Sequence, residues 1–204
     1  MIRHSHVDYS PGTPITDRNP LTPVGLRLAD LLAQRVRGWG LEQLYVSTMV
    51  RTQQTADAIS RLLPDVPRWN MDELRETSID DMVGYDGEMP SEDLVVWGAE
   101  HFRYADEHMQ GRLARGWERI LAHLDASGLQ RVAIVSHGAA MNGLLHQFLG
   151  PPAWDRACWV DFYWAAITCL EYGPNLRRVR WLNDSRHAEP LRQEIKAYGE
   201  TLSG

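Results

Sequence analysis

The run of four apolar residues from Val132 to Val135 constrains the fold more than any other feature of this sequence. An unbroken apolar run of this length is typical of a strand that is covered on both faces. The polar triplet Ser136-His137-Gly138 follows it directly, and a helix is predicted from about Ala139 to Phe148. A buried strand that leads straight into a helix is typical of α/β proteins.

The rest of the chain repeats this alternation of strands and helices. Thr22-Pro23 predicts the start of a helix, because an N-cap hydroxyl and a proline at the first helical position both favour one. Apolar periodicity and turn residues predict the following elements: helices at about 22–38, 55–63 and 91–126, and strands at 44–46, 167–171 and 176–182. We therefore expect an α/β three-layer sandwich, with a mostly parallel central sheet and helices on both faces. Residues 1–204 are expected to form a single domain with a helical insertion at about 77–110.

Composition excludes several classes of partner and location. The net charge is −6 and no basic stripe is present, which argues against nucleic acid but not against a small anionic substrate. The most apolar stretch, residues 157–170, is interrupted by Asp161 and is too short to span a bilayer. The chain opens without the apolar segment of a signal peptide, and its two cysteines form no disulfide framework. We expect a cytoplasmic protein that binds neither nucleic acid nor membrane.

Polar signatures follow three of the predicted strands. They are Arg3-His4, the segment from Ser47 to Ala56, and Ser136-His137-Gly138. In α/β sheets, ligands bind beyond the carboxyl ends of the strands, and helix N-termini favour anions. Two arginines and two histidines that meet there suit a phosphate dianion, because the guanidinium fork can hold two phosphate oxygens.

These motifs resemble those of the histidine phosphatase (phosphoglycerate-mutase-like) superfamily. Arg3-His4 is similar to the RHG opening of that family, and Ser136-His137-Gly138 matches its S-H-G. The other similar segments are Leu21–Gly25 (L-T-x-x-G), Ser47–Ala56 (S-P-L-x-R-x-x-Q-T-A), Leu74-Arg75-Glu76 (the L-x-E of the branch with a glutamate proton donor) and Leu182–His187 (a common ending in that branch). The resemblance covers nearly the whole chain.

The resemblance implies a role for each matching residue. His4 would be the nucleophile that carries the phosphoryl group, and Glu76 would be the general acid. Arg3, Arg51 and His137 would surround the phosphate, and no metal or cofactor would be needed. Cations beside His4 disfavour its protonation, which keeps a lone pair free for attack.

Several positions depart from the family pattern. Ser5 stands where the family usually has glycine, and His6 stands where it usually has an acidic or polar residue. Only Met1 and Ile2 precede Arg3, so the first strand either is minimal or begins before residue 1. The glycine that usually follows the glutamate closely is Gly84 here, which leaves three rivals to Glu76 as proton donor: Asp80, Asp81 and Glu88.

The leading functional hypothesis is a metal-independent phosphatase that hydrolyses a small phosphorylated metabolite through a phosphohistidine. A cofactor-dependent phosphoglycerate mutase is the alternative within the family, although such mutases usually carry longer insertions and a longer tail. A catalytically weak binding protein is a third hypothesis, against which the intact set of Arg3, His4, Arg51 and His137 argues. His4-Ser5-His6 could also form half a metal site, but no ligand pair at metal-like spacing completes it. Whether the protein is a homodimer is left open.

Overall fold

A computed structural model describes residues 1–8, 16–82, 84–87, 89, 99–150, 159–173 and 175–200. In this part of the chain the strands form one six-stranded sheet, in the order β3-β2-β4-β1-β5-β6. The strands are β1 (Ile2–Arg3), β2 (Gln43–Ser47), β3 (Arg68–Met71), β4 (Val132–Ser136), β5 (Ile167–Gly173) and β6 (Leu176–Asp184). The first four are parallel, whereas β5 pairs antiparallel with both β1 and β6. The predicted α/β class with a mostly parallel sheet is confirmed.

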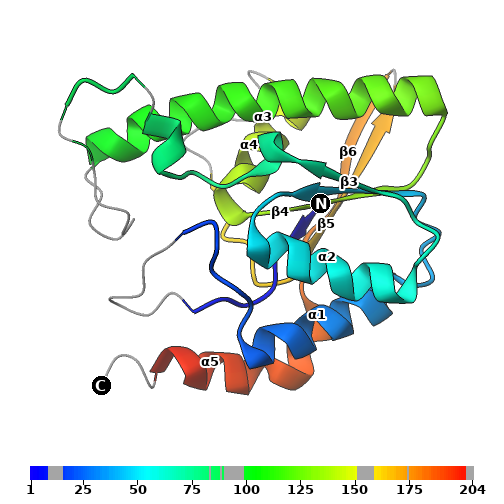
Figure 1. The fold of residues 1–204 in the computed structure, drawn as a ribbon. Coiled ribbons are helices and arrows are strands. Elements are labelled where there is room, and N and C mark those ends of the chain that lie inside the picture. The colour runs from blue at the N-terminus through cyan, green and yellow to red at the C-terminus, as the bar shows by residue number, and fades with distance from the viewer. Residues whose placement is uncertain are drawn as a thin grey trace.

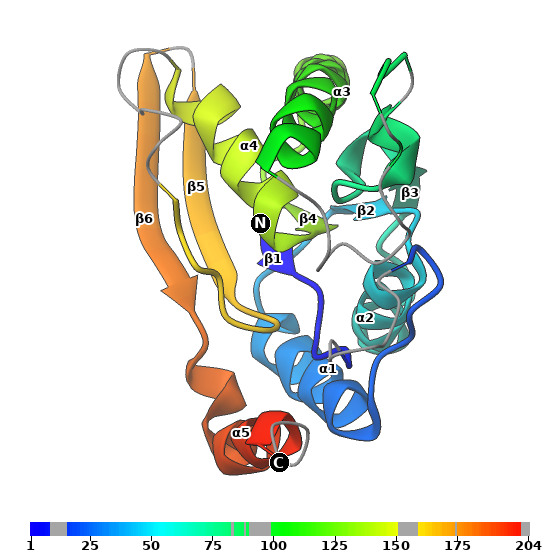
Figure 2. The ribbon, with the colours of Figure 1, turned by 90° about the vertical axis from the view of Figure 1, so that its left-hand side faces the viewer.

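Helices cover both faces of this sheet. They are α1 (Pro23–Val36), α2 (Val50–Leu62), α3 (Ala99–Ser127), α4 (Gly138–Leu149) and α5 (Arg192–Glu200). Figure 1 shows α3 and α4 on one side of the sheet and α1, α2 and α5 on the other, and Figure 2 shows the same three layers after a quarter turn. Among the helices that the structure describes, none combines the length and the apolar character needed to cross a membrane.

The central strands are apolar throughout because each face of the sheet has its own core. Leu44 and Val46 of β2 lie in the cluster formed with α1 and α2, whereas Tyr45 lies in the cluster formed with α3 and α4. In β4, Val135 belongs to the first cluster and Ile134 to the second. Alternate side chains thus enter opposite cores, which explains the unbroken apolar run.

Some elements differ from the sequence prediction. Strand β3 was not predicted, because Arg68-Trp69-Asn70-Met71 lies at the sheet edge and buries only Met71 fully. Helix α5 and the 3-10 helix Arg186–Leu191 before it were also missed. In the predicted insertion at about 77–110, Ile79–Met82 form a 3-10 helix and α3 begins at Ala99, whereas residues 83, 88 and 90–98 lie outside the described residues.

Gly25 allows α1 to pack directly against the loop that follows β1. A Cβ atom at this position would lie 2.2 Å from the main-chain oxygen of His6, a contact that no side-chain rotation can relieve. We expect Gly25→Ala to lower Tm by roughly 2–12 °C, since overpacking of this kind costs about 1–3 kcal/mol. Gly38→Ala is the matched control, because nothing lies within 4 Å of its Cβ position. Equal thermal melts of the two variants would contradict this packing.

Candidate active site

The sheet topology brings the three polar signatures to one edge. Strands β2, β4 and β1 are neighbours and parallel, so the residues that follow them lie side by side. The Oγ of Ser47, the last residue of β2, lies 2.8 Å from Nε2 of His137, which follows β4. The ring of His4, after β1, lies 5.1 Å from that of His137, measured between centroids. Residues up to 133 positions apart thus meet as the sequence predicted.

His4 is held as a neutral imidazole with one nitrogen available. Its Nδ1 lies 2.7 Å from the main-chain oxygen of Ser5, which can only accept, so the proton lies on Nδ1 and the lone pair on Nε2. The side chain is buried. Burial, followed by the positive charges of Arg51 and Arg3, holds the pKa of His4 well below its usual value of 6.5. At neutral pH this histidine is therefore unprotonated, and the lone pair on Nε2 is available.

Arg51 is a buried cation at the start of α2. Its side chain is 1% exposed; Nη1 donates to the main-chain oxygen of Thr16 at 2.9 Å, and Nε donates to Nδ1 of His137 at 3.2 Å. Within the described part of the chain, no carboxylate forms an ion pair with it. A buried charge normally has a partner of opposite sign. Among the described residues, the site therefore presents a positive charge that is complementary to an anion.

His137 is also neutral, and its tautomer follows from its neighbours. The Nε–H of Arg51 can only donate, so Nδ1 of His137 accepts and Nε2 carries the proton that is donated to Ser47. Burial, followed by the positive charge of Arg51, holds the pKa of His137 well below its usual value. Ser47 thus fixes the orientation of this ring, a role that sequence reasoning had not assigned to it.

A tryptophan forms one wall of the site. The guanidinium of Arg3 lies 3.9 Å from the centroid of the Trp164 ring and also donates through Nη1 to the main-chain oxygen of Phe162. The Trp164 ring lies 5.4 Å from that of His4. Such stacking orients the cation. The sequence did not single out Trp164, because it lies in a loop before β5 and no motif marks it.

Ser5 and His6, which depart from the family pattern, both bond to residues of α1, its N-cap or α2. The hydroxyl of Ser5 donates to the main-chain oxygen of Gly25 at 2.6 Å, and its N–H donates to Thr55 Oγ1 at 3.0 Å. His6 Nδ1 lies 2.8 Å from Thr22 Oγ1, and its ring packs against Trp164. Among the described residues, no three His, Cys, Asp or Glu side chains gather as a metal site.

Glu76 caps the N-terminus of α4. One carboxylate oxygen accepts from the N–H of Ala139 at 3.0 Å, and the other accepts from Ala140 at 3.1 Å and from Thr77 at 3.2 Å. This helix N-terminus, which we had expected to favour phosphate, therefore already holds a carboxylate of the chain. The helix begins immediately after His137, so Glu76 lies beside the histidine site.

The rivals of Glu76 fall into two groups. Asp81 forms an ion pair with Arg112, whose Nη2 lies 3.0 Å from each carboxylate oxygen, and one of those oxygens also accepts from the N–H of Ser78. Both oxygens of Asp81 are thus engaged in holding the loop. Arg112, which the sequence did not mark, also donates to the main-chain oxygen of Glu76. The side chain of Asp80, and Glu88 altogether, lie outside the described residues.

Comparison with known proteins places this geometry in context. Residues 1–185 match the family model of the histidine phosphatase superfamily, branch 1. A probable phosphoglycerate mutase, GpmB of Yersinia pestis (strain Pestoides F), is 31% identical in an alignment of 163 residues that covers 75% of each chain.

Solved structures share the fold. YhfR of Bacillus stearothermophilus superposes with a TM-score of 0.68 at 21% identity, over 91% of this chain and 96% of that one. A mycobacterial glucosyl-3-phosphoglycerate phosphatase, solved with VO3, superposes with a TM-score of 0.68 at 20% identity, over 90% and 97% of the two chains. At these identities the likeness shows the fold alone.

Proposed function

Because this chain belongs to branch 1 of the histidine phosphatase superfamily, we propose that it is a metal-independent phosphatase that forms a phosphohistidine on His4. Its substrate is a small phosphate monoester. One observation carries the proposal: the buried Arg51 has no carboxylate partner in the described part of the chain and lies beside neutral histidines. A dianionic phosphate supplies the missing charge, and His4 supplies the electron pair.

The reaction proceeds in two displacements. In the first, Nε2 of His4 attacks phosphorus, the bond to the ester oxygen breaks, and the departing alcohol takes a proton from an acid. In the second, water attacks phosphorus, the phosphorus–nitrogen bond breaks, and inorganic phosphate forms. Arg3 and Arg51 stabilise the charge on the transferring group in both steps, which is the largest contribution that a protein makes to phosphoryl transfer.

Glu76 is the proposed acid of the first step and base of the second. Its carboxylate accepts from three backbone N–H groups, which hold it beside the two histidines. In the first step it gives a proton to the departing oxygen, and in the second it takes one from the attacking water.

Phosphoglycerate mutase activity is the second candidate function, and the name of the Yersinia relative favours it. A mutase returns the phosphoryl group to a second hydroxyl of the substrate, whereas a phosphatase passes it to water. Incubation with 3-phosphoglycerate and 2,3-bisphosphoglycerate discriminates the two. We expect release of inorganic phosphate without formation of 2-phosphoglycerate, and rapid isomerisation would replace the phosphatase proposal with the mutase one.

The experiment that tests the proposal is hydrolysis of p-nitrophenyl phosphate before and after prolonged treatment with EDTA. Arginines supply the positive charge here, so we expect full turnover after chelation. Loss of turnover that a divalent ion restores would favour the metal site on His4 and His6. Absence of turnover with every phosphate ester would favour the third hypothesis, a catalytically weak binding protein. A screen of phosphorylated metabolites under the same conditions addresses the substrate, while the cytoplasmic location stays a prediction.

The role of Glu76 is tested through the leaving group. An alkyl phosphate expels an alkoxide that needs a proton, whereas p-nitrophenyl phosphate expels a phenolate that needs little help. We expect Glu76→Gln to slow alkyl substrates about a hundredfold while sparing the nitrophenyl ester. Glu73→Gln is the control, because Glu73 lies three residues before Glu76, in the 3-10 helix Asp72–Leu74, and pairs with Arg119. Equal slowing of both substrates by Glu76→Gln would make Glu76 only a helix cap, and Asp80 and Glu88 would be tested next.

A further inference from the structure

Asn183 holds the loop 160–165, which precedes β5, from the side of β6. Its Oδ1 accepts from the N–H of Tyr163 at 2.8 Å, and its Nδ2 donates to the main-chain oxygen of Asp161 at 2.8 Å. A carboxamide can make both bonds because it carries an acceptor and a donor. Asn183 belongs to the ending Leu182–His187 that the sequence singled out, and no step of the proposed reaction uses it.

Asn142 holds the same loop from the side of α4. Its side chain is buried, and its Oδ1 accepts from the N–H of Val160 at 2.8 Å. Its Nδ2 donates to the main-chain oxygen of Val160 at 3.0 Å and to that of Gly138 at 2.9 Å. Val160 thus exchanges both main-chain bonds with one side chain, as it would with a neighbouring strand. Asn142 and Asn183 together form what we call the asparagine clamp.

The loop that the asparagine clamp holds is the one that orients Arg3. The main-chain oxygen of Phe162 accepts from Nη1 of Arg3, and the ring of Trp164 lies 3.9 Å from the guanidinium. The loop also bonds to the main chain beside the nucleophile, because the N–H of Ala165 donates to the oxygen of His4 at 3.1 Å. The direction of the Arg3 guanidinium therefore depends on where this loop lies.

The turn that carries Trp164 contains a strained residue. The N–H of Ala166 donates to the main-chain oxygen of Tyr163 at 3.1 Å, and Ala165 within this turn has a φ of 54°. The left-handed region is unfavourable for alanine, because its Cβ atom approaches the following carbonyl oxygen. Such a conformation persists only where the surrounding contacts enforce it. The bond from the Tyr163 N–H to the clamp, at the start of the turn, is a contact of this kind.

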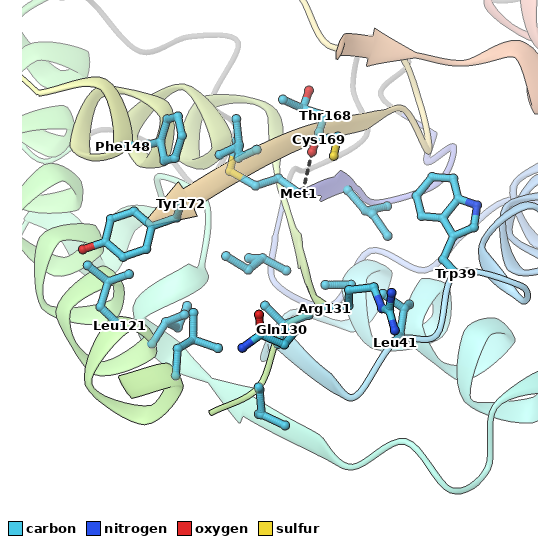
Figure 3. A pocket seen from close by; sticks show the side chains of 18 of the residues that line it. Met1, Trp39, Leu41, Leu121, Gln130, Arg131, Phe148, Thr168, Cys169 and Tyr172 are labelled. Carbon is cyan, nitrogen blue, oxygen red and sulfur yellow. Dashed lines mark hydrogen bonds between the residues drawn. The ribbon is translucent and has the colours of Figure 1, made fainter. Parts of the chain in front are cut away.

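Asn183 is itself bonded to the strand next to β1. Its N–H donates to Oγ1 of Thr168 in β5 at 3.2 Å. The main-chain oxygen of Thr168 accepts from the amine of Met1 at 2.7 Å, and the N–H of Thr168 donates to the oxygen of Met1 at 2.8 Å. Figure 3 shows Thr168 and Met1 at the wall of a cavity that none of the five proposed site residues lines. Asn183 is thus bonded, through Thr168, to the segment that carries Arg3.

We propose that Asn142 and Asn183 are positioning residues, which hold the guanidinium of Arg3 in place for phosphate by fixing the main chain of the loop 160–165. This inference rests on the proposed function, in which Arg3 stabilises the charge on the transferring phosphoryl group. Neither asparagine acts on the phosphate directly, because each acts through the Phe162 carbonyl and the Trp164 ring. A cation that is already oriented stabilises the transition state without reorganisation during the reaction.

The first test uses the free protein and is independent of turnover. Asn183→Gly removes both side-chain bonds, and glycine readily adopts the φ of 56° that Asn183 has. We expect the NMR signal of the Arg3 Nε–H group, assigned by its loss in Arg3→Lys, to be displaced by the ring current of Trp164. This displacement should disappear in Asn183→Gly and persist in Leu182→Gly, the control with an exposed side chain on the same strand. A displacement that is absent in the wild type, or retained in Asn183→Gly, would overturn the proposal.

The second test is a double-mutant cycle with Arg3→Ala, in which calorimetry measures the binding of inorganic phosphate. We expect Asn183→Gly to weaken binding about fivefold or more when Arg3 is present, and less than about twofold in the Arg3→Ala background. Asn142→Ala should give the same pattern. Equal losses in both backgrounds would make the asparagines purely structural and overturn the proposal. If the wild type neither binds phosphate nor hydrolyses any ester, the proposed function fails, and the NMR comparison still decides whether the clamp orients Arg3.

Discussion

Replacement of His4 by alanine is expected to abolish turnover of every phosphate monoester while the protein remains folded. The covalent route cannot begin without the Nε2 lone pair, so the loss should be at least about a thousandfold in kcat. The anion site itself, with Arg3 and Arg51, stays in place, so KM for residual activity or the binding of inorganic phosphate should change little. Steady-state hydrolysis of p-nitrophenyl phosphate and phosphate binding by calorimetry give both quantities.

The matched control for this variant is His123→Gln. His123 is on α3, where its Nδ1 lies 2.7 Å from the hydroxyl of Tyr45 and its ring packs against Trp69, so its loss should leave kcat unchanged. Far-UV circular dichroism confirms that both variants fold. Turnover in the His4→Ala protein within tenfold of the wild type would remove His4 from the mechanism.

Arg51→Lys is expected to have the second largest effect. Lysine keeps the charge, but it cannot hold two phosphate oxygens at once or donate simultaneously to Thr16 and His137 as the guanidinium does. We expect kcat/KM to fall roughly a hundredfold, the usual loss when one preorganised donor to the transition state is removed. Vanadate, which mimics five-coordinate phosphorus, should bind the variant less tightly by a similar factor.

Arg61→Lys is the control on the same helix. The Arg61 side chain is 62% exposed and pairs with Asp30, so the exchange should alter neither turnover nor vanadate inhibition. Equal vanadate affinity for Arg51→Lys and the wild type would place Arg51 outside the phosphate site.

The sequence predicted the strand ends well because each motif directly follows or opens a regular element. The apolar run Val132–Val135 predicted β4. The carboxyl ends of neighbouring parallel strands lie at one edge of the sheet, and this brings His4, Arg51 and His137 together. Spacing along the chain could not reveal the side chains from other helices and loops that bond to the site residues. Arg112 lies on a 29-residue helix among several other arginines, and its bond to the Glu76 carbonyl exists only in three dimensions.

The edges of the fold were less predictable than its centre. β3 alternates polar and apolar residues over only four positions, which is too short a pattern to predict a strand at the edge of a sheet. Trp164 was missed because a stacking partner of Arg3 can come from any loop near the site. The capping contacts of Glu76 were also beyond the sequence, since they depend on where α4 begins relative to the loop after β3.

The central claim is that His4 carries the phosphoryl group, and a quenched phospho-enzyme tests it most directly. The protein is mixed briefly with radiolabelled substrate, denatured in alkali and divided between acid and alkali. We predict a label that is labile in acid and stable in alkali, as a phosphohistidine is, and that maps to the peptide containing His4. The His4→Ala protein should take up no label while Arg61→Lys labels normally. An acid-stable label on a serine or threonine, or an equal label in His4→Ala, would contradict the account.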